Sequence, residues 1–219
     1  MVNWMGDTGD SDSITERKSE KLKMSLLSVT SYLLPFASSI PPFWGGIMTL
    51  PFLFYLIGMI GNLQFIIYPS DLINLVAVFG SLFFIVYCVV YLWRQKSKVG
   101  LVTTGPYRFV RHPQYFSVMI FTFILTFQSV WTLQHTFGIG WLSAEQTILL
   151  WIAMLLAYVG IASVEEHHLS NVFGSEWNDY RTRVGFLIPF VKFDSKILEA
   201  IICLFIPLVF LYVCLFLFR

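Results

Sequence analysis

Long apolar segments alternate with short polar ones along most of this chain. Five segments of roughly 19–22 residues have no acidic or basic residue in their interior, and a helix of that length crosses the ~30 Å core of a bilayer. These segments lie at about residues 47–68, 72–93, 114–133, 146–164 and 198–218. The pattern predicts an all-α, polytopic membrane helix bundle with five to six transmembrane helices.

The number of helices depends on residues 25–44. This segment is partly apolar, but it contains Pro35 and the pair Pro41-Pro42. Proline removes a helical hydrogen bond, so the segment either crosses the membrane with a kink or lies as a broken hairpin at the interface. Residues 1–24 are polar, and we expect a disordered N-terminal tail followed by one membrane domain over residues 25–219.

Composition supports a membrane protein and excludes two other classes. The chain is 57% hydrophobic and 12% charged, whereas soluble domains contain about 25% charged residues. Its net charge of +1 gives no basis for nucleic-acid binding. The three cysteines all lie in apolar runs and form neither a disulfide framework nor a zinc site. We therefore expect membrane lipids as partners, and neither nucleic acid nor metal.

Basic residues concentrate in two loops and predict the orientation of the helices. Lys and Arg are frequent at residues 94–111 and again at 181–196, and absent from residues 134–145. Two helices separate the basic loops, so both can face the cytosol. The basic residues of the tail also favour the cytosol, which requires that residues 25–44 do not fully cross.

Two polar clusters at predicted helix ends are candidates for chemistry. The first is residues 101–115, in which Gly105-Pro106 predicts a turn and Pro113 suits the first turn of a helix. The second is residues 165–168, Glu-Glu-His-His, at the end of the helix predicted over 146–164. Adjacent carboxylates at a helix C-terminus need a positive partner, which Arg111, a cationic ligand, or both would supply.

Two further patterns lie near the second cluster. Adjacent histidines at 167 and 168 point about 100° apart on a helix and have no third ligand at zinc spacing, so they do not predict a metal site. After the break at Gly174-Ser175, apolar residues recur at helical spacing and predict a short amphipathic helix on the membrane surface. Its apolar residues, counted from just before the break, are Phe173, Trp177, Tyr180 and Val184.

Several of these motifs together resemble the isoprenylcysteine carboxyl methyltransferase family, which is related to the phospholipid N-methyltransferases. The motifs are residues 101–115, the pair Glu165-Glu166, Phe173-Gly174 with Trp177 and Tyr180, and Ile188-Pro189-Phe190. Their order and spacing match over about residues 99–192, nearly half of the chain.

The resemblance implies a cytosolic pocket for S-adenosyl-L-methionine, and two catalytic candidates, Arg111 and Glu166. The implied cofactor-binding residues are Val99, Gly100, Leu101, Val102, Tyr107, His112, Pro113, Gln114, Tyr115 and Glu165. The tyrosines suit the adenine or the cation, Glu165 suits the ammonium, and Arg111 or helix N–H groups suit the carboxylate. It also implies the endoplasmic reticulum membrane in a eukaryote, or the cytoplasmic membrane in a prokaryote.

The chain departs from the family pattern at three places. Ser117 stands where members usually have Gly, and a helix at 198–218 follows the motif region, where relatives commonly end. Ile161 stands where members that methylate prenylcysteine have an Arg thought to reach the substrate carboxylate. This last departure puts the acceptor, rather than the cofactor, in question.

Four functions remain open at this point. The first is O-methylation of a C-terminal S-prenylcysteine on a protein, and the second is N-methylation of a phosphatidylethanolamine-type lipid. An anionic carboxylate acceptor needs no base, whereas an ammonium must first lose a proton, for which Glu166 or His167 is a candidate. A sterol-reductase-like enzyme shares an Arg-His-Pro-x-Tyr element but typically has more helices. A non-catalytic membrane protein has no need for Glu165 and His112.

Overall fold

The computed structural model describes residues 41–62, 72–135, 140–193 and 195–217, and these form no β-strand. Side chains are described from residue 46 onward within these ranges, apart from those of residues 72–74 and 96–99. The chain divides into two compact units, Met1–Ile47 and Met48–Arg219. In the first unit the described residues, 41–47, form the start of a helix. The predicted disordered tail and residues 25–40 lie outside the described residues.

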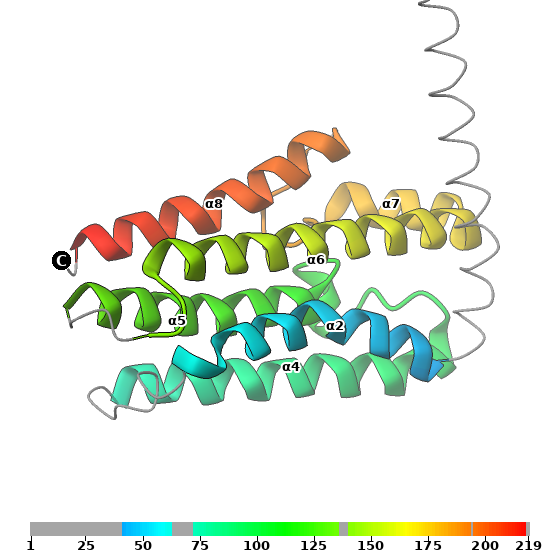
Figure 1. The fold of residues 1–219 in the computed structure, drawn as a ribbon. Helices are drawn as coiled ribbons and strands as arrows, with labels where there is room; N and C mark the ends of the chain where they lie inside the picture. Colours follow the sequence, from blue (N-terminus) through cyan, green and yellow to red (C-terminus); the bar gives the residue numbers. More distant parts are fainter. Residues whose placement is uncertain (1–40, 63–71, 136–139, 194, 218–219) are drawn as a thin grey trace, which may run out of the picture. The chain divides into compact units, whose positions relative to one another are not determined.

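Six α-helices and two 3-10 turns make up the described residues (Figure 1). In chain order they are α2 (Pro41–Met59), η1 (Ile60–Asn62), α4 (Leu72–Val99), η2 (Gly105–Arg108), α5 (Pro113–His135), α6 (Ala144–Phe173), α7 (Ser175–Arg183) and α8 (Lys196–Leu217).

Four of the helices are long and apolar enough to cross a membrane. The spans are Leu75–Gln95, Pro113–His135, Ala144–Phe173 and Lys196–Leu217. They correspond to four of the five predicted segments, so the expectation of an all-helical fold with helices able to span a membrane is confirmed for the described residues. The remaining segment, predicted at 47–68, corresponds to the shorter apolar stretch Gly46–Asn62. A total of five to six transmembrane helices stays a prediction.

Four helix boundaries differ from the prediction by more than two residues, one of them the end of α2 at Met59 instead of residue 68. α2 begins at Pro41, because proline fits the first turn of a helix, where its missing N–H costs nothing. α4 extends past residue 93 to Val99, since the Arg and Lys residues there are good helix formers. α6 extends past residue 164 to Phe173, because no helix-breaking residue precedes Gly174. The predicted capping box of α6 is confirmed, with Ser143 and Gln146 bonded reciprocally.

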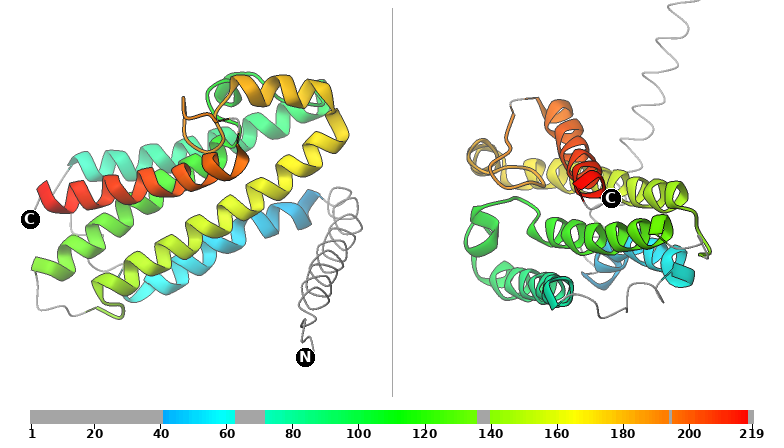
Figure 2. Two further views of the ribbon diagram at one scale, coloured as in Figure 1. Left: turned by 90° about the horizontal axis from the view of Figure 1, so that it is seen from above. Right: turned by 90° about the vertical axis from the view of Figure 1, so that its left-hand side faces the viewer.

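Helix α5 is the centre of the second unit. Figure 2 shows it between α4 on one side and α6 and α8 on the other, and it packs against all three. Its span is 61% buried, compared with 11% for the spans of α4 and α8. Helices of the bundle are also joined by polar contacts: the Tyr55 hydroxyl donates to the Thr122 carbonyl at 3.1 Å, and the Trp151 indole donates to the Thr122 hydroxyl at 3.0 Å. Such pairing is required where no water is present.

Two loops meet at one end of the helices and position the candidate site. The loop from Gly100 to His112 joins α4 to α5, and the loop after α7 leads to α8. Val110 and Gly185 form an isolated parallel bridge between these loops, in which the Arg111 N–H donates to the Gly185 carbonyl at 2.9 Å. The two basic segments predicted to share one side of the membrane are therefore held together by the backbone.

Helix α7 confirms the predicted short helix after Gly174. Gly174 has φ 54° and separates α6 from α7, a conformation that favours glycine. Trp177 and Tyr180 are 1% and 3% exposed and pack with Leu101 and Val184. The apolar side of α7 is thus covered by the loop after α4. Phe173 belongs to the end of α6 rather than to α7.

Candidate functional site

Arg111 is the central cation of a buried group of charged side chains. One terminal nitrogen of its guanidinium lies 2.9 Å from Oε1 of Glu166 on α6, and the other lies 2.5 Å from Oε2 of Glu199 on α8. The Arg111 side chain is 0% exposed, and the two carboxylates are 4% and 3% exposed. Its guanidinium carbon also lies 5.4 Å from the centre of the Phe186 ring. Arg111 therefore joins the loop before α5 to two helices.

His112 extends the group to a third carboxylate. Its Nδ1 lies 3.3 Å from Oε2 of Glu165, and its Nε2 lies 3.6 Å from Oε1 of Glu166. Burial lowers the pKa of His112, but the hydrogen bonds and negative charges of Glu165 and Glu166 outweigh burial and raise it to about 9. A carboxylate oxygen faces each ring nitrogen, which is the environment of a doubly protonated imidazolium. His112 is therefore a second cation at neutral pH.

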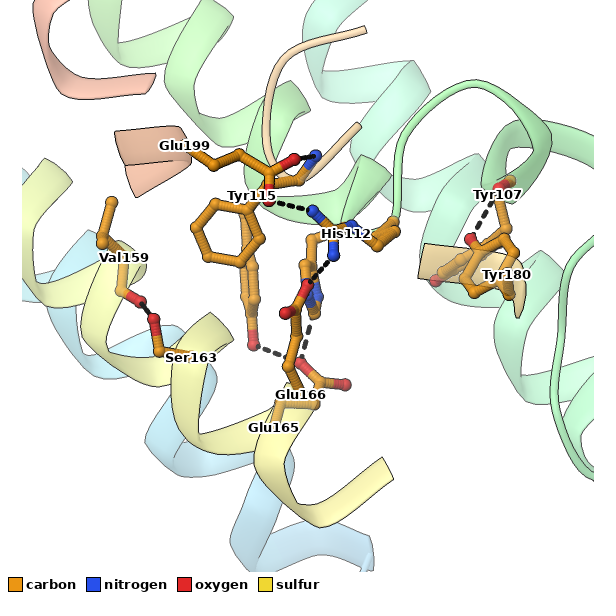
Figure 3. Close-up of polar contacts among 11 residues, drawn as sticks. Tyr107, His112, Tyr115, Val159, Ser163, Glu165, Glu166, Tyr180 and Glu199 are labelled. Carbon is orange, nitrogen blue, oxygen red and sulfur yellow. Dashed lines mark hydrogen bonds and ion pairs between the residues drawn. The ribbon is translucent and has the colours of Figure 1, made fainter. Parts of the chain in front are cut away.

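Glu165 differs from its neighbour in its exposure. Its side chain is 18% exposed, and its Oε2 accepts a hydrogen bond of 3.2 Å from the Tyr115 hydroxyl. The Tyr115 ring stacks on the His112 ring with centres 5.4 Å apart. Figure 3 shows His112 and Tyr115 side by side, both directed at Glu165. Glu165 is thus the carboxylate of the group that a ligand from outside can reach.

A second layer of polar contacts lies behind this group. The Tyr107 hydroxyl donates to Gln114 Oε1 at 3.1 Å, and the Tyr180 hydroxyl of α7 donates to the Tyr107 carbonyl at 2.6 Å. Burial, and then the negative charge of Glu165, raise the pKa of Tyr107. Tyr107 therefore keeps its proton and acts only as a neutral donor.

Gly105 allows the loop to reach this position. It has φ +61°, and a Cβ there would lie 2.5 Å from the Tyr91 ring. The Tyr91 hydroxyl in turn lies 2.8 Å from the Thr104 hydroxyl. The turn predicted at Gly105-Pro106 is present as η2, and the positive φ of its first residue favours glycine.

The predicted site residues fall into separate places. Arg111, His112, Tyr115, Glu165 and Glu166 lie in one contact group. Tyr107 and Gln114 are bonded to each other, and Pro113 begins α5. Leu101 and Val102 are buried, Leu101 against α7, while Gly100 is exposed. The side chain of Val99 lies outside the described part of the chain.

The carboxylate pair Glu165-Glu166 differs from expectation in its place on the helix and agrees with it in having a positive partner. Glu165 and Glu166 do not lie at the end of α6, because the helix continues to Phe173, so no helix-dipole penalty applies to them. The expected positive partner is present for Glu166, in the form of Arg111. Since both terminal nitrogens of Arg111 already face protein carboxylates, it is not placed to bind a ligand carboxylate as well. His167 is exposed, and its Nε2 lies 3.4 Å from the Asn171 amide.

Glu199 is a member of the charged group that was not predicted from the sequence. It lies in the first turn of α8 and is 2% exposed. Its Oε1 accepts a hydrogen bond of 3.1 Å from the Phe186 N–H, in addition to the Arg111 ion pair. The available signal was an acidic residue near the end of an otherwise apolar span, because such residues are expensive in a membrane and mark functional sites.

An apolar cleft lies on α4 near the same loop. Its volume is about 610 Å³, and its lining includes Phe84, Tyr87, Phe109, Phe116 and Phe190, with Arg108 as the charged residue. Among the described residues, no group of three or more His, Cys, Asp and Glu side chains is arranged to hold a metal ion.

The chain matches no protein-family model, no curated protein and no solved structure.

Proposed function

We propose that this chain is an S-adenosyl-L-methionine-dependent methyltransferase acting on a membrane-embedded, lipid-like substrate at the cytosolic face. One observation carries the proposal. The loop at 101–115 and the pair Glu165-Glu166, which are distant in sequence and carry the family resemblance, meet in a single group of buried and partly buried charged side chains. A chain that only spanned the membrane would gain nothing from this arrangement, since burying charges is costly.

The residues of the site fit the proposed cofactor. At neutral pH the carboxylates of Glu165, Glu166 and Glu199 face two cations, Arg111 and the His112 imidazolium. One negative charge is left over, and Glu165 is the carboxylate that is partly exposed. A site with one excess carboxylate and adjacent tyrosine rings suits a ligand with a net positive charge and an aromatic base.

Each residue then has a defined role. When bound, the cofactor supplies an electrophilic methyl group on a sulfonium. Glu165 holds the cationic end of the cofactor, while His112 and Tyr115 hold Glu165 through its Oε2. Arg111 fixes Glu166, and Glu166 in turn faces His112. Burial of these side chains excludes water, so alignment of donor and acceptor provides most of the acceleration.

The first candidate acceptor is the carboxylate of a C-terminal S-prenylcysteine on a protein. This acceptor is already anionic, so the reaction requires no general base from the protein. The apolar cleft near α4 and the apolar surfaces of the spans provide surroundings suited to a prenyl chain.

The second candidate acceptor is the amine of a phosphatidylethanolamine-type lipid. One observation favours it: Ile161, which occupies the place of the expected substrate Arg, packs against the apolar core. An ammonium acceptor must lose a proton before it can accept the methyl group. Glu166 is a poor base because Arg111 pairs with it, which leaves the exposed His167 as the candidate base.

Cofactor binding tests the proposal directly. Purified protein in detergent should bind S-adenosyl-L-methionine saturably, and Glu165→Gln should weaken binding by at least about tenfold, because a charge-assisted hydrogen bond to a ligand is worth roughly 1.5–3 kcal/mol. Glu176→Gln is the matched control, since Glu176 is exposed on α7. Equal binding by both variants, or binding of a nicotinamide dinucleotide in place of S-adenosyl-L-methionine, would contradict the proposal.

A second assay separates the two acceptors. The protein is incubated with labelled methyl donor and either a farnesylated cysteine or phosphatidylethanolamine in vesicles. Base-labile release of the label identifies a methyl ester, whereas base-stable incorporation identifies an N-methyl group. Incorporation into neither acceptor would reject both candidates.

A further inference from the structure

The first turn of α8 brings Glu199 into the candidate site from outside the region of family resemblance. That region ends at about residue 192, and α8 begins at Lys196. Glu199 nevertheless lies 88 residues from its partner Arg111, with the two side chains in direct contact and both excluded from solvent. The last helix is therefore part of the charged group and not an appendage to it.

Glu199 has one contact that anchors the helix and one that does not. Its Oε1 accepts the Phe186 N–H, which ties α8 to the preceding loop. A neutral glutamine would satisfy this bond equally well, since its side-chain oxygen is also an acceptor. The second contact, from Oε2 to Arg111, places an additional negative charge on a cation that Glu166 already neutralises. Anchoring alone does not account for the charge of this buried group.

The charge of Glu199 changes the balance of the whole site. With it, three carboxylates face the two cations Arg111 and His112. Without it, the carboxylates of Glu165 and Glu166 are matched one to one by Arg111 and His112 in these ion pairs. Glu199 thus adds a further negative charge to the group, and it does so through its contact with Arg111.

The ion pairs form a continuous path through the site. Glu199 contacts Arg111, Arg111 contacts Glu166, Glu166 faces His112, and His112 contacts the partly exposed Glu165. In a buried setting such charges act on each other more strongly than in water. Glu199 can therefore influence a ligand at Glu165 without touching it.

We propose that Glu199 is a specificity-determining residue that acts through Arg111 and makes the site prefer the cationic methyl donor over its neutral demethylated product. The inference rests on the proposed function. S-adenosyl-L-methionine carries a sulfonium, whereas S-adenosylhomocysteine has a neutral thioether and is otherwise the same molecule. A site with excess negative charge binds the first more tightly relative to the second, and this preference assists exchange of product for a new donor.

The binding preference is the measurement that tests this role. The dissociation constants of both ligands are measured by calorimetry in detergent for the wild type, Glu199→Gln and Glu176→Gln. Glu199→Gln should lower the preference for the donor about fivefold or more, a coupling of ordinary size between two sites. Glu176→Gln removes the same charge from the exposed surface of α7 and should leave the preference unchanged.

A charge-balanced double variant separates charge from packing. Arg111→Gln combined with Glu199→Gln removes one charge of each sign, so the excess negative charge of the site is retained. The donor preference should return to within about twofold of the wild type, although absolute affinity for both ligands falls. A preference that stays low in the double variant would overturn the proposal. If Glu199→Gln does not fold, the double variant still provides this test.

The pKa of His112, measured without ligand, tests the same coupling between Glu199 and the rest of the site. In NMR titrations of protein labelled at histidine, Glu199→Gln should lower the pKa of His112 by at least about 1, since it removes a negative charge and leaves Arg111 less neutralised. The titratable groups that contact His112 among the described residues are Glu165, Glu166 and Tyr115, and the substitution leaves them unchanged. An unaltered titration would contradict the coupling through Arg111.

The outcomes for the inference and for the proposed function are distinct. Wild-type protein that binds neither ligand overturns both of them. Wild-type protein that binds S-adenosyl-L-methionine, with an unchanged preference in Glu199→Gln, overturns the role of Glu199 alone.

Discussion

The Arg111→Met variant tests whether the charged group supports the fold as well as the site. Methionine replaces the aliphatic stem of arginine with an unbranched apolar chain but removes the guanidinium that lies within 2.9 Å of Glu166 and 2.5 Å of Glu199. Both carboxylates then remain buried. Glu199 keeps the bond from the Phe186 N–H, and Glu166 keeps the contact of 3.6 Å to His112.

The expected cost follows from this loss of partners. Removing one member of a buried ion pair costs about 3–5 kcal/mol, because the remaining charge is left uncompensated. For a chain of this size, 1 kcal/mol corresponds to about 2–4 °C in the midpoint of thermal unfolding. Arg111→Met should therefore lower that midpoint by roughly 6–20 °C. The midpoint of Arg111→Lys should fall between those of Arg111→Met and the wild type, since an ammonium cannot hold two carboxylates in the fixed geometry of a guanidinium.

Thermal unfolding in detergent, followed by the fluorescence of a thiol- or tryptophan-based probe, measures the effect. Arg108→Met is the matched control, because Arg108 is exposed and makes no hydrogen bond or ion pair with the described residues. Its midpoint should lie within about 2 °C of the wild type, as for other exposed substitutions. Equal midpoints for Arg111→Met and Arg108→Met would refute the interpretation of Arg111 as a buried ionic link.

Two further substitutions test the loop that carries the site. Gly105→Ala should destabilise the protein by about 1–3 kcal/mol in thermal unfolding, because an alanine there has an unfavourable positive φ and a Cβ that contacts Tyr91. Gly80 has open space around it, so the control Gly80→Ala should cause no loss of stability. Tyr180→Phe should cost about 1 kcal/mol in the same measurement, through loss of the 2.6 Å bond to the Tyr107 carbonyl. Gly105→Ala as stable as Gly80→Ala, or Tyr180→Phe as stable as the wild type, would contradict the corresponding contact.

The helical spans were predictable because hydrophobic runs of bilayer length have few alternative structures. The spans of α4, α5, α6 and α8 each contain a predicted segment or most of it. The ends of the helices were less predictable, and α6 shows the reason. Its hydrophobic run stops near residue 164, but the helix continues for more than two turns because Glu and His residues are tolerated in helices. Hydrophobicity measures the apolar segment, whereas helix length depends on the first residue that breaks the helix, here Gly174.

The candidate site was predictable only in part, for a similar reason. The contacts of Arg111 and His112 with Glu165 and Glu166 join two motifs that share a family resemblance, so their meeting could be expected. The contact with Glu199 depends on how α8 packs against the loop before α5, and no local pattern encodes that packing. An acid in the first turn of an apolar helix indicates that a partner exists. The acidic residue alone does not identify its partner, because several loops contain a cation.

The pH dependence of stability follows from the position of His112. Its ordinary pKa is 6.5, and in the folded protein Glu165 and Glu166 raise it to about 9 despite complete burial. Because the folded pKa lies above the unfolded one, the stabilisation is fully present below about pH 6.5 and is lost as the pH rises through about 9. A difference of 2.5 between these two values corresponds to about 3 kcal/mol.

Thermal unfolding between about pH 6 and pH 9.5 should therefore show a decline for the wild type that is largely absent in His112→Gln. At pH 6 the variant should be less stable by about 3 kcal/mol, and by pH 9.5 the free energies of unfolding of the two proteins should agree to within roughly 1 kcal/mol. A lost packing contact would lower the midpoint of His112→Gln by the same amount at every pH. Parallel curves would thus show that His112 is neutral in the folded protein. The ion pairs of the site would then contain two more carboxylates than cations. The preference for a ligand with a single positive charge would lose its basis.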